Sequence, residues 1–467
     1  MSPDEYAQLD AIGLAELIRC AEVNPAQVLE AAIAWAEEVN PRINAIVRTQ
    51  YDEARRCLEH DADVSRGPFH GVPFLLKDGV AQAGVPAPSG SALNDVPAPA
   101  DSTLLRRYRK AGFNVMGRTN MPEWGLCAAT APRAYGPCRN PWNLEFNAGG
   151  SSGGAAAAVA AGIVPVACGG DGAGSIRIPA SCCGLFGYKP TRYLTPNGPG
   201  PIDVWGGLVA QHVLSRTVRD SAALLDASAG PEPGDSAAAP VPRRRALDAI
   251  ASAPRRLRIA WSVEAPGGVP VDAECGAAVE VAARMCSDLG HEVEPVPLEV
   301  DDEALRQACR DLIAGSCATD LREIEVARGA ALTADALEDV TWLFIEHGRR
   351  LTAVDAMAAQ RTIQREGRRV AAFFADHDVY LTPTLASPPP ELNRYGMMGH
   401  TSLDAYLDEL FGFIPFTPLA NMMGQPAMSV PMARSSIGLP IGVHFSARCG
   451  EDDVLFSLAA QLEHARS

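Results

Sequence analysis

Two glycine-dense turns that carry serines stand out in the sequence. The first, GGSSGG, spans residues 149–154, and the second, GDGAGS, spans residues 170–175. Glycine-rich turns at helix starts leave backbone N–H groups unobstructed, and such groups can stabilise an oxyanion. A serine hydroxyl beside these donors becomes a nucleophile when a base takes its proton. The pair of turns therefore predicts acyl-transfer chemistry with a serine nucleophile.

A candidate base lies upstream, in the apolar run GVPFLLKD of residues 71–78. The run predicts a buried strand with Lys77 at its C-terminal end, although a lysine at a strand end is by itself more typical of the surface. A lysine taken out of water can lose its proton near neutral pH and serve as a base. We interpret Lys77 as that base because the two serine turns follow it, and we expect Asp78 to be structural.

The residues between the two turns predict the elements that position them. The alanine run 155–161 predicts a helix, and the apolar, β-branched run 163–168 predicts a strand. A second helix is predicted to begin near Ser175. The order loop, helix, strand, loop, helix would bring both serine turns to one site.

These motifs resemble those of the amidase signature family. GGSSGG, GDGAGSIRIPAS and GLFGYKPT are similar to its signature stretch, and GVPFLLKD is similar to its lysine motif. The likeness extends over nearly the whole chain and is closest to bacterial members that act on nylon-oligomer amides. It implies a Ser–cis-Ser–Lys triad with Ser175 as nucleophile, Ser151 as the bridging serine and Lys77 as base. The Gly150–Ser151 peptide is then expected to be cis.

The resemblance also implies the groups around the nucleophile. The N–H groups of Gly172, Ala173, Gly174 and Ser175 are the expected oxyanion donors. The family commonly has G-T-D-x-G-G-S, so Gly170 and Ala173 depart from its pattern. Because alanine keeps its N–H group, we expect activity to survive with an altered pocket shape.

Two further sets of residues have expected roles in the site. Asp171 and Arg177 are predicted to form a structural ion pair behind the nucleophile, and a direct substrate contact is the alternative. The predicted substrate-binding residues are Trp124, Leu126, Tyr135 and Ser152. For the apolar residues of 124–135, ordinary core packing is an equally good interpretation. The pocket is further expected to draw on apolar residues of 313–345.

Composition excludes several classes of function. The chain has 467 residues and a formal net charge of −16, which argues against nucleic-acid or anionic-membrane partners. Its twelve cysteines show no C-x-x-C spacing, and no signal peptide is evident, so reduced thiols in the cytoplasm are expected. The nine histidines have no metal-binding spacing, so we expect no metal or organic cofactor. A monomer or homodimer acting on small-molecule amides is predicted.

The chain predicts an α/β fold with a central mixed β-sheet covered by helices on both faces. We expect one amidase domain over residues 1–467, with a signature core at about 65–230. A semi-autonomous α/β lobe is predicted at about 255–375, and a sheet-completing segment at about 376–467. The Pro-, Ala- and Arg-rich residues 231–254 predict a surface linker.

The first fifty residues predict two helices that cover the sheet. Asp10 is expected to cap one of them. Asn24 followed by Pro25 predicts the start of the second. Asn40 and Pro41 are expected to end it.

The predicted activity is hydrolysis of carboxamide C–N bonds other than peptide bonds, through an acyl-Ser175 intermediate. Linear, cyclic or aryl amides are the expected substrates, with carbamates and esters as side activities. One alternative is an amidotransferase A-type subunit that needs partner proteins. Another is an α/β-hydrolase esterase, since residues 149–153 fit G-x-S-x-G and His444 or His464 could complete a triad. Against it, residues 143–148 predict a polar turn rather than the required apolar strand.

Overall fold

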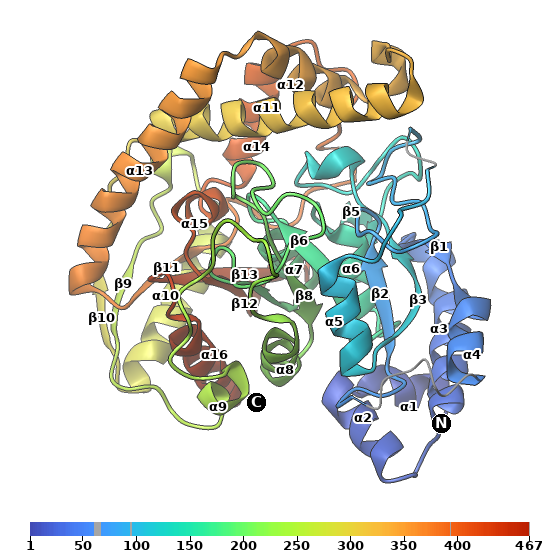
Figure 1. Ribbon diagram of the computed structural model, residues 1–467. Helices are drawn as coiled ribbons and strands as arrows, with labels where there is room; N and C mark the ends of the chain where they lie inside the picture. Colours follow the sequence, from blue (N-terminus) through green and yellow to red (C-terminus); the bar gives the residue numbers. More distant parts are fainter. Residues whose placement is uncertain (60–66, 94–95, 393, 467) are drawn as a thin grey trace.

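A mixed β-sheet forms the centre of the computed structural model, which describes residues 1–59, 67–93, 96–392 and 394–466 (Figure 1). Within these ranges eleven strands follow the order β1-β3-β2-β6-β8-β7-β12-β13-β11-β9-β10, and β4 and β5 form a separate two-stranded sheet. The strands are β1 (Ile46–Thr49), β2 (Pro73–Lys77), β3 (Asn114–Thr119), β4 (Arg139–Asn140), β5 (Asn143–Asn147), β6 (Val166–Asp171), β7 (Phe186–Lys189), β8 (Ala210–Ser215), β9 (Arg258–Trp261), β10 (Glu292–Pro295), β11 (Val379–Pro383), β12 (Ala427–Arg434) and β13 (Pro440–Ala447).

Helices cover both faces of this sheet, which confirms the predicted α/β class. They are α1 (Pro3–Gln8), α2 (Ala11–Arg19), α3 (Pro25–Ile43), α4 (Tyr51–Glu59), α5 (Thr103–Ala111), α6 (Gly153–Ala160), α7 (Arg177–Cys183), α8 (Val218–Ser228), α9 (Ala246–Ile250), α10 (Ala273–Asp288), α11 (Asp302–Arg328), α12 (Asp339–Arg350), α13 (Ala353–Asp376), α14 (Leu403–Phe413), α15 (Thr417–Met423) and α16 (Asp452–Arg466). Among the described residues, none of these helices is long and apolar enough to cross a bilayer. All twelve cysteines are free thiols.

The N-terminal segment forms three helices where two were predicted, because Ser2 also caps a short first helix. Asp10 and Asn24 cap α2 and α3 as expected. Helix α3 continues through Pro41 instead of ending there. In the last turn a proline costs little, since few hydrogen bonds remain to be lost. The helix ends at Asn44, which takes a left-handed conformation with φ +53°.

Strand β2 lies at the point where the predicted site elements meet. It pairs in parallel with β3 on one side and with β6 on the other, and all five of its residues are buried. The carboxyl ends of parallel strands lie at the same edge of a sheet. The end of β2, which carries Lys77, therefore lies beside the turn that follows β6.

Helix α6 consists of glycines, alanines and one valine, and it packs against β2, β3, β6 and β8. Seven of its eight residues are buried. The contact is closest at Gly154, where an added Cβ would lie 2.3 Å from the Asn120 backbone nitrogen. Small residues thus let the helix that follows the first serine turn approach the sheet.

The second half of the chain extends the sheet and supplies an outer helical layer. Strands β9 and β10 pair in parallel with each other, and β9 pairs with β11 at the same end of the sheet. Helix α11 packs against α12 and α13, at the top and left of Figure 1. Because β9 and β10 belong to the central sheet, this segment shares the sheet with the signature core. The division into core, lobe and C-terminal segment stays a prediction.

We predict that Gly154→Ala lowers the free energy of unfolding by at least about 1–3 kcal/mol, because the methyl group overlaps the Asn120 backbone. Gly315→Ala is the matched control. Gly315 lies within α11, where an added Cβ meets nothing within 4 Å. Alanine at this position should therefore raise the free energy of unfolding by up to about 1 kcal/mol. Urea denaturation followed by circular dichroism measures both. Equal midpoints for the two variants would contradict the close approach of α6.

Candidate active site

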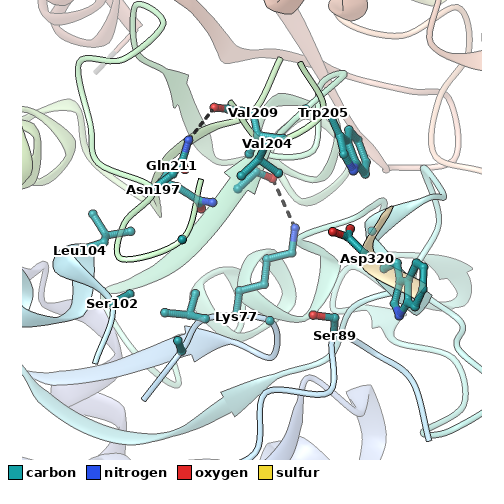
Figure 2. A pocket seen from close by; sticks show the side chains of 18 of the residues that line it. Lys77, Ser89, Ser102, Leu104, Asn197, Val204, Trp205, Val209, Gln211 and Asp320 are labelled. Carbon is teal, nitrogen blue, oxygen red and sulfur yellow. Dashed lines mark hydrogen bonds between the residues drawn. The ribbon is translucent and has the colours of Figure 1, made fainter. Parts of the chain in front are cut away.

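Lys77 ends β2 and reaches from the sheet edge into a cleft (Figure 2). The residue is 7% exposed; its Nζ donates to Ser151 Oγ at 2.7 Å and to the Gly170 carbonyl at 3.3 Å. Burial lowers the pKa of Lys77 to about 8, against opposing effects of Cys168 and Asp171. A pKa in this range leaves a usable share of neutral amine near neutral pH, as a general base requires.

Ser151 precedes Ser152, the N-cap of α6, and the peptide bond that joins Ser151 to Gly150 is cis, as predicted. A Cβ at position 150 would lie 2.8 Å from the Cys127 carbonyl oxygen, so the position favours glycine. The Ser151 hydroxyl also lies close to Gly125, where an added Cβ would be 3.2 Å from Ser151 Oγ. The bridging serine is therefore enclosed by backbone on one side and bonded to Lys77 on the other.

Ser175 lies in the turn between β6 and α7 and lines the same cleft as Lys77 and Ser151. Its carbonyl accepts a hydrogen bond from the Ser152 N–H at 3.2 Å, which ties the two serine turns together. Helix α7 begins at Arg177, two residues after the predicted start. Within the described ranges no hydrogen bond joins the Ser151 and Ser175 hydroxyls, so the full triad stays a prediction.

A buried ion pair lies behind the second serine turn, where it was predicted. Arg177 Nη2 and Asp171 Oδ1 are 2.9 Å apart, and both side chains are fully buried. Arg177 Nη1 also donates to the Thr417 carbonyl at 2.9 Å, and Asn421 Nδ2 donates to Asp171 Oδ1 at 2.9 Å. Burial alone would raise the pKa of Asp171, but the Arg177 charge and hydrogen bonds hold it well below its usual value. The carboxylate is thus charged at neutral pH and can fix the loop that carries Ser175.

The ion pair also uses one of the predicted oxyanion donors. The Gly174 N–H donates to Asp171 Oδ1 at 2.7 Å, so it is directed at the carboxylate rather than at a substrate. Its φ of +125° explains why glycine stands here. The expectation for Gly174 is therefore corrected. The N–H groups of Gly172, Ala173 and Ser175 remain the predicted donor set.

The cleft has a volume of about 510 Å³. A second, apolar pocket of about 40 Å³, here called the arm, shares Gly125, Ser175 and Trp205 with the cleft as lining residues. Trp124 lines the cleft as predicted, and Leu126 lines the arm together with Ile313 and Phe344. Side chains of the cleft that the sequence did not predict include Ser89, Ser102, Leu104, Asn197, Val204, Trp205, Val209, Gln211 and Asp320 (Figure 2). The one sequence signal for part of this wall is the turn-forming run PNGPGP of residues 196–201, which contains a cis Gly198–Pro199 bond.

The Gln211 side chain lies next to Gly170, where the family commonly has threonine. A Cβ at Gly170 would lie 2.7 Å from Gln211 Oε1. The Gln211 side chain therefore occupies space that a larger residue at position 170 would need. An altered pocket shape stays a prediction.

Two predicted substrate-binding residues do not line the cleft or its arm. The Tyr135 hydroxyl donates to Asp78 Oδ2 at 3.3 Å, and burial is the main cause that raises the pKa of Tyr135 to about 12. Ser152 is fully buried, and its hydroxyl bonds the Gly170 N–H and carbonyl, each at 3.3 Å. Tyr135 therefore bonds a buried carboxylate and Ser152 bonds the backbone of Gly170, and neither side chain lines the cleft or the arm.

The α/β-hydrolase alternative does not fit this arrangement. Residues 143–147 form strand β5 of the separate two-stranded sheet, so the predicted polar turn is wrong, yet no strand of the central sheet leads into the first serine turn. His444 Nε2 lies 2.8 Å from Arg177 Nη1, and burial keeps the pKa of His444 well below its usual value. His464 lies exposed near the end of α16. Neither histidine lines the cleft that holds the serines.

We predict that Arg177→Met costs about 3–5 kcal/mol of unfolding free energy, because it leaves the buried Asp171 carboxylate without its cation. The double variant Asp171→Asn with Arg177→Met removes that charge as well and should recover part of the loss. Urea unfolding of the three proteins measures the difference. A double variant no more stable than Arg177→Met would count against the ion pair as the cause.

Comparison with known proteins agrees with this geometry. The family model described as Amidase matches residues 27–456. A 6-aminohexanoate-cyclic-dimer hydrolase of Paenarthrobacter ureafaciens is 37% identical over 471 residues, covering 98% of this chain and 94% of that protein. The solved structure of a 6-aminohexanoate cyclic dimer hydrolase matches with a TM-score of 0.91 at 36% identity, over 98% of this chain and 97% of that one. The solved structure of a bacterial aryl acylamidase matches with a TM-score of 0.88 at 30% identity, over 98% of this chain and 96% of that one. The chain therefore belongs to the amidase signature family of amide-hydrolysing enzymes.

Proposed function

We propose that this enzyme cleaves carboxamide C–N bonds through an acyl-Ser175 intermediate. The observation that carries the proposal is the 2.7 Å contact between Lys77 Nζ and Ser151 Oγ in a cleft that Ser175 also lines. The low pKa of Lys77, caused by burial, supports its role as the base. The cis peptide before Ser151 is the arrangement expected of the bridging serine.

In the first half-reaction neutral Lys77 takes the proton of Ser151, which takes the proton of Ser175. Ser175 Oγ attacks the amide carbonyl, and the negative oxygen is bound by backbone N–H groups of residues 172–175 other than that of Gly174. When the C–N bond breaks, Ser151 gives its proton to the departing nitrogen and Lys77 returns one to Ser151. The amine leaves and the acyl group stays on Ser175.

In the second half-reaction water replaces the amine. The same relay takes a proton from water, whose oxygen attacks the acyl carbon. The ester bond to Ser175 breaks, Ser175 regains its proton, and the carboxylic acid leaves. No step requires a group other than the three side chains, the backbone donors and water.

The proposed substrates are linear, cyclic or aryl amides with apolar chains, and carbamates and esters are proposed side activities. The apolar arm next to Ser175, lined by Leu126, Ile313 and Phe344, suits such a chain. The related proteins named above as a cyclic-dimer hydrolase and an aryl acylamidase support the same substrate classes.

We predict that Ser175→Ala and Lys77→Ala nearly abolish turnover of a simple anilide, with Lys77→Ala losing at least about 10²–10⁴-fold in rate. Ser151→Ala should keep a small residual activity. Ser436→Ala, an exposed serine outside the cleft, is the control. Amine release by the purified chain alone also excludes a partner-dependent amidotransferase subunit. Full activity of Lys77→Ala would overturn the proposed base.

We predict that kcat/KM for an uncharged anilide rises with pH and levels off above about 8. The pKa of Lys77 is lowered to about 8, so the neutral base accumulates as pH rises through that value. An unperturbed lysine would place the rise near pH 10.4 instead. A pH–rate profile between 6 and 11 distinguishes the two. Activity that falls as pH rises from 6 to 8 would contradict a base of this pKa.

A further inference from the structure

The cleft contains a charged group that the proposed reaction does not use. Among the described residues, the ionisable side chains that line the main cleft are Lys77 and Asp320. Lys77 is bonded to Ser151 and has a place in the reaction. The Asp320 carboxylate makes no hydrogen bond or ion pair with any described part of the chain.

Asp320 reaches the cleft from α11, a helix of the outer layer. Ile324, one turn further along the same helix, lines the cleft too, so one face of α11 forms part of its wall. In Figure 2 the Asp320 side chain points into the cleft from the side on which Trp205 and Ser89 lie. The carboxylate is therefore accessible to a ligand bound in the cleft.

The surroundings of Asp320 suit a cation. Leu93, Trp124 and Trp205 line the same cleft, and indole rings attract cations electrostatically. Burial by the cleft walls, together with the neighbouring Glu323 charge, raises the pKa of Asp320 to about 6. The group is still mostly ionised at pH 7. The Asp320 side chain is exposed to solvent where it lines the cleft, so its carboxylate is accessible to a cation, with which it can form a charge-assisted hydrogen bond.

We propose that the cleft binds amide substrates that carry an ammonium group, with Asp320 as the counter-ion. This inference rests on the proposed amidase function and narrows its substrate class. The substrate has an apolar part, which enters the arm lined by Ile313 and Phe344, and an amine-bearing part, which extends along the main cleft toward α11. Its reacting carbonyl lies at Ser175, which lines both spaces.

The test compares matched pairs of p-nitroanilides that differ only at the end of the chain, where one carries an ammonium group and the other a methyl group. One series has the chain on the acyl side with four to eight carbons, and a second series has it on the aniline side. The wild-type protein should prefer the ammonium member of at least one pair by roughly 10- to 100-fold in kcat/KM, the range of one charge-assisted hydrogen bond. Asp320→Asn should bring that ratio close to one.

Glu323→Gln is the matched control because it removes a nearby charge on the same helix from a residue that does not line the cleft. It should leave the ratio unchanged. A wild-type ratio near one in both series overturns the inference while anilide hydrolysis itself upholds the amidase function. A ratio that Asp320→Asn leaves intact also overturns it. If the wild-type protein cleaves no anilide of either series, the proposed function fails instead.

Discussion

The site depends on keeping one amine out of water. A lysine side chain buried at the end of β2 must lose most of its hydration, which is why burial lowers the pKa of Lys77 to about 8. Strand β2 delivers the amine to such a place because it lies between β3 and β6 with every residue buried. The Ser151 hydroxyl then supplies a hydrogen-bond partner that carries no charge of its own. A carboxylate in that position would favour the charged amine and defeat its use as a base.

A buried pair of opposite charges lies behind the turn that carries Ser175. The Asp171 carboxylate is balanced by Arg177 and holds the Gly174 N–H, so one ion pair sets the shape of the turn that carries Ser175. The same bond removes Gly174 from the donors available to a substrate. Within this turn, the Gly174 N–H group thus holds the loop in shape, and the N–H groups of Gly172, Ala173 and Ser175 remain the predicted oxyanion donors. The small residues of α6 serve a similar purpose, since they bring the Ser151 turn within reach of the sheet.

The local parts of this design could be predicted from the sequence, and the distant ones could not. The strand ending in Lys77 follows from an apolar run, the Asp171–Arg177 pair was predicted from two charged residues within one motif, and the cis bond before Ser151 was implied by the resemblance to the amidase signature family. Tyr135 and Ser152 were assigned to the pocket from their position near the motifs, but their hydroxyls bond to groups of the protein. The direction of a side chain depends on packing, which spacing along the chain does not encode.

The cleft residues on α11 were even harder to predict from the sequence. Asp320 is separated from Ser175 by more than a hundred residues. Apolar residues of 313–345 were expected in the pocket, but no motif on α11 marks this acidic residue as part of the site. The pKa of Lys77 is set by burial and by the neighbouring Cys168 and Asp171. Asp320 is not among these influences, so its charge does not raise the pKa of the proposed base. A carboxylate placed there can attract a cation without holding the base in its charged form. In the proposed arrangement, Asp320 on α11 binds the substrate cation and Lys77 on β2 acts as the base, so the two roles belong to different elements of the cleft wall.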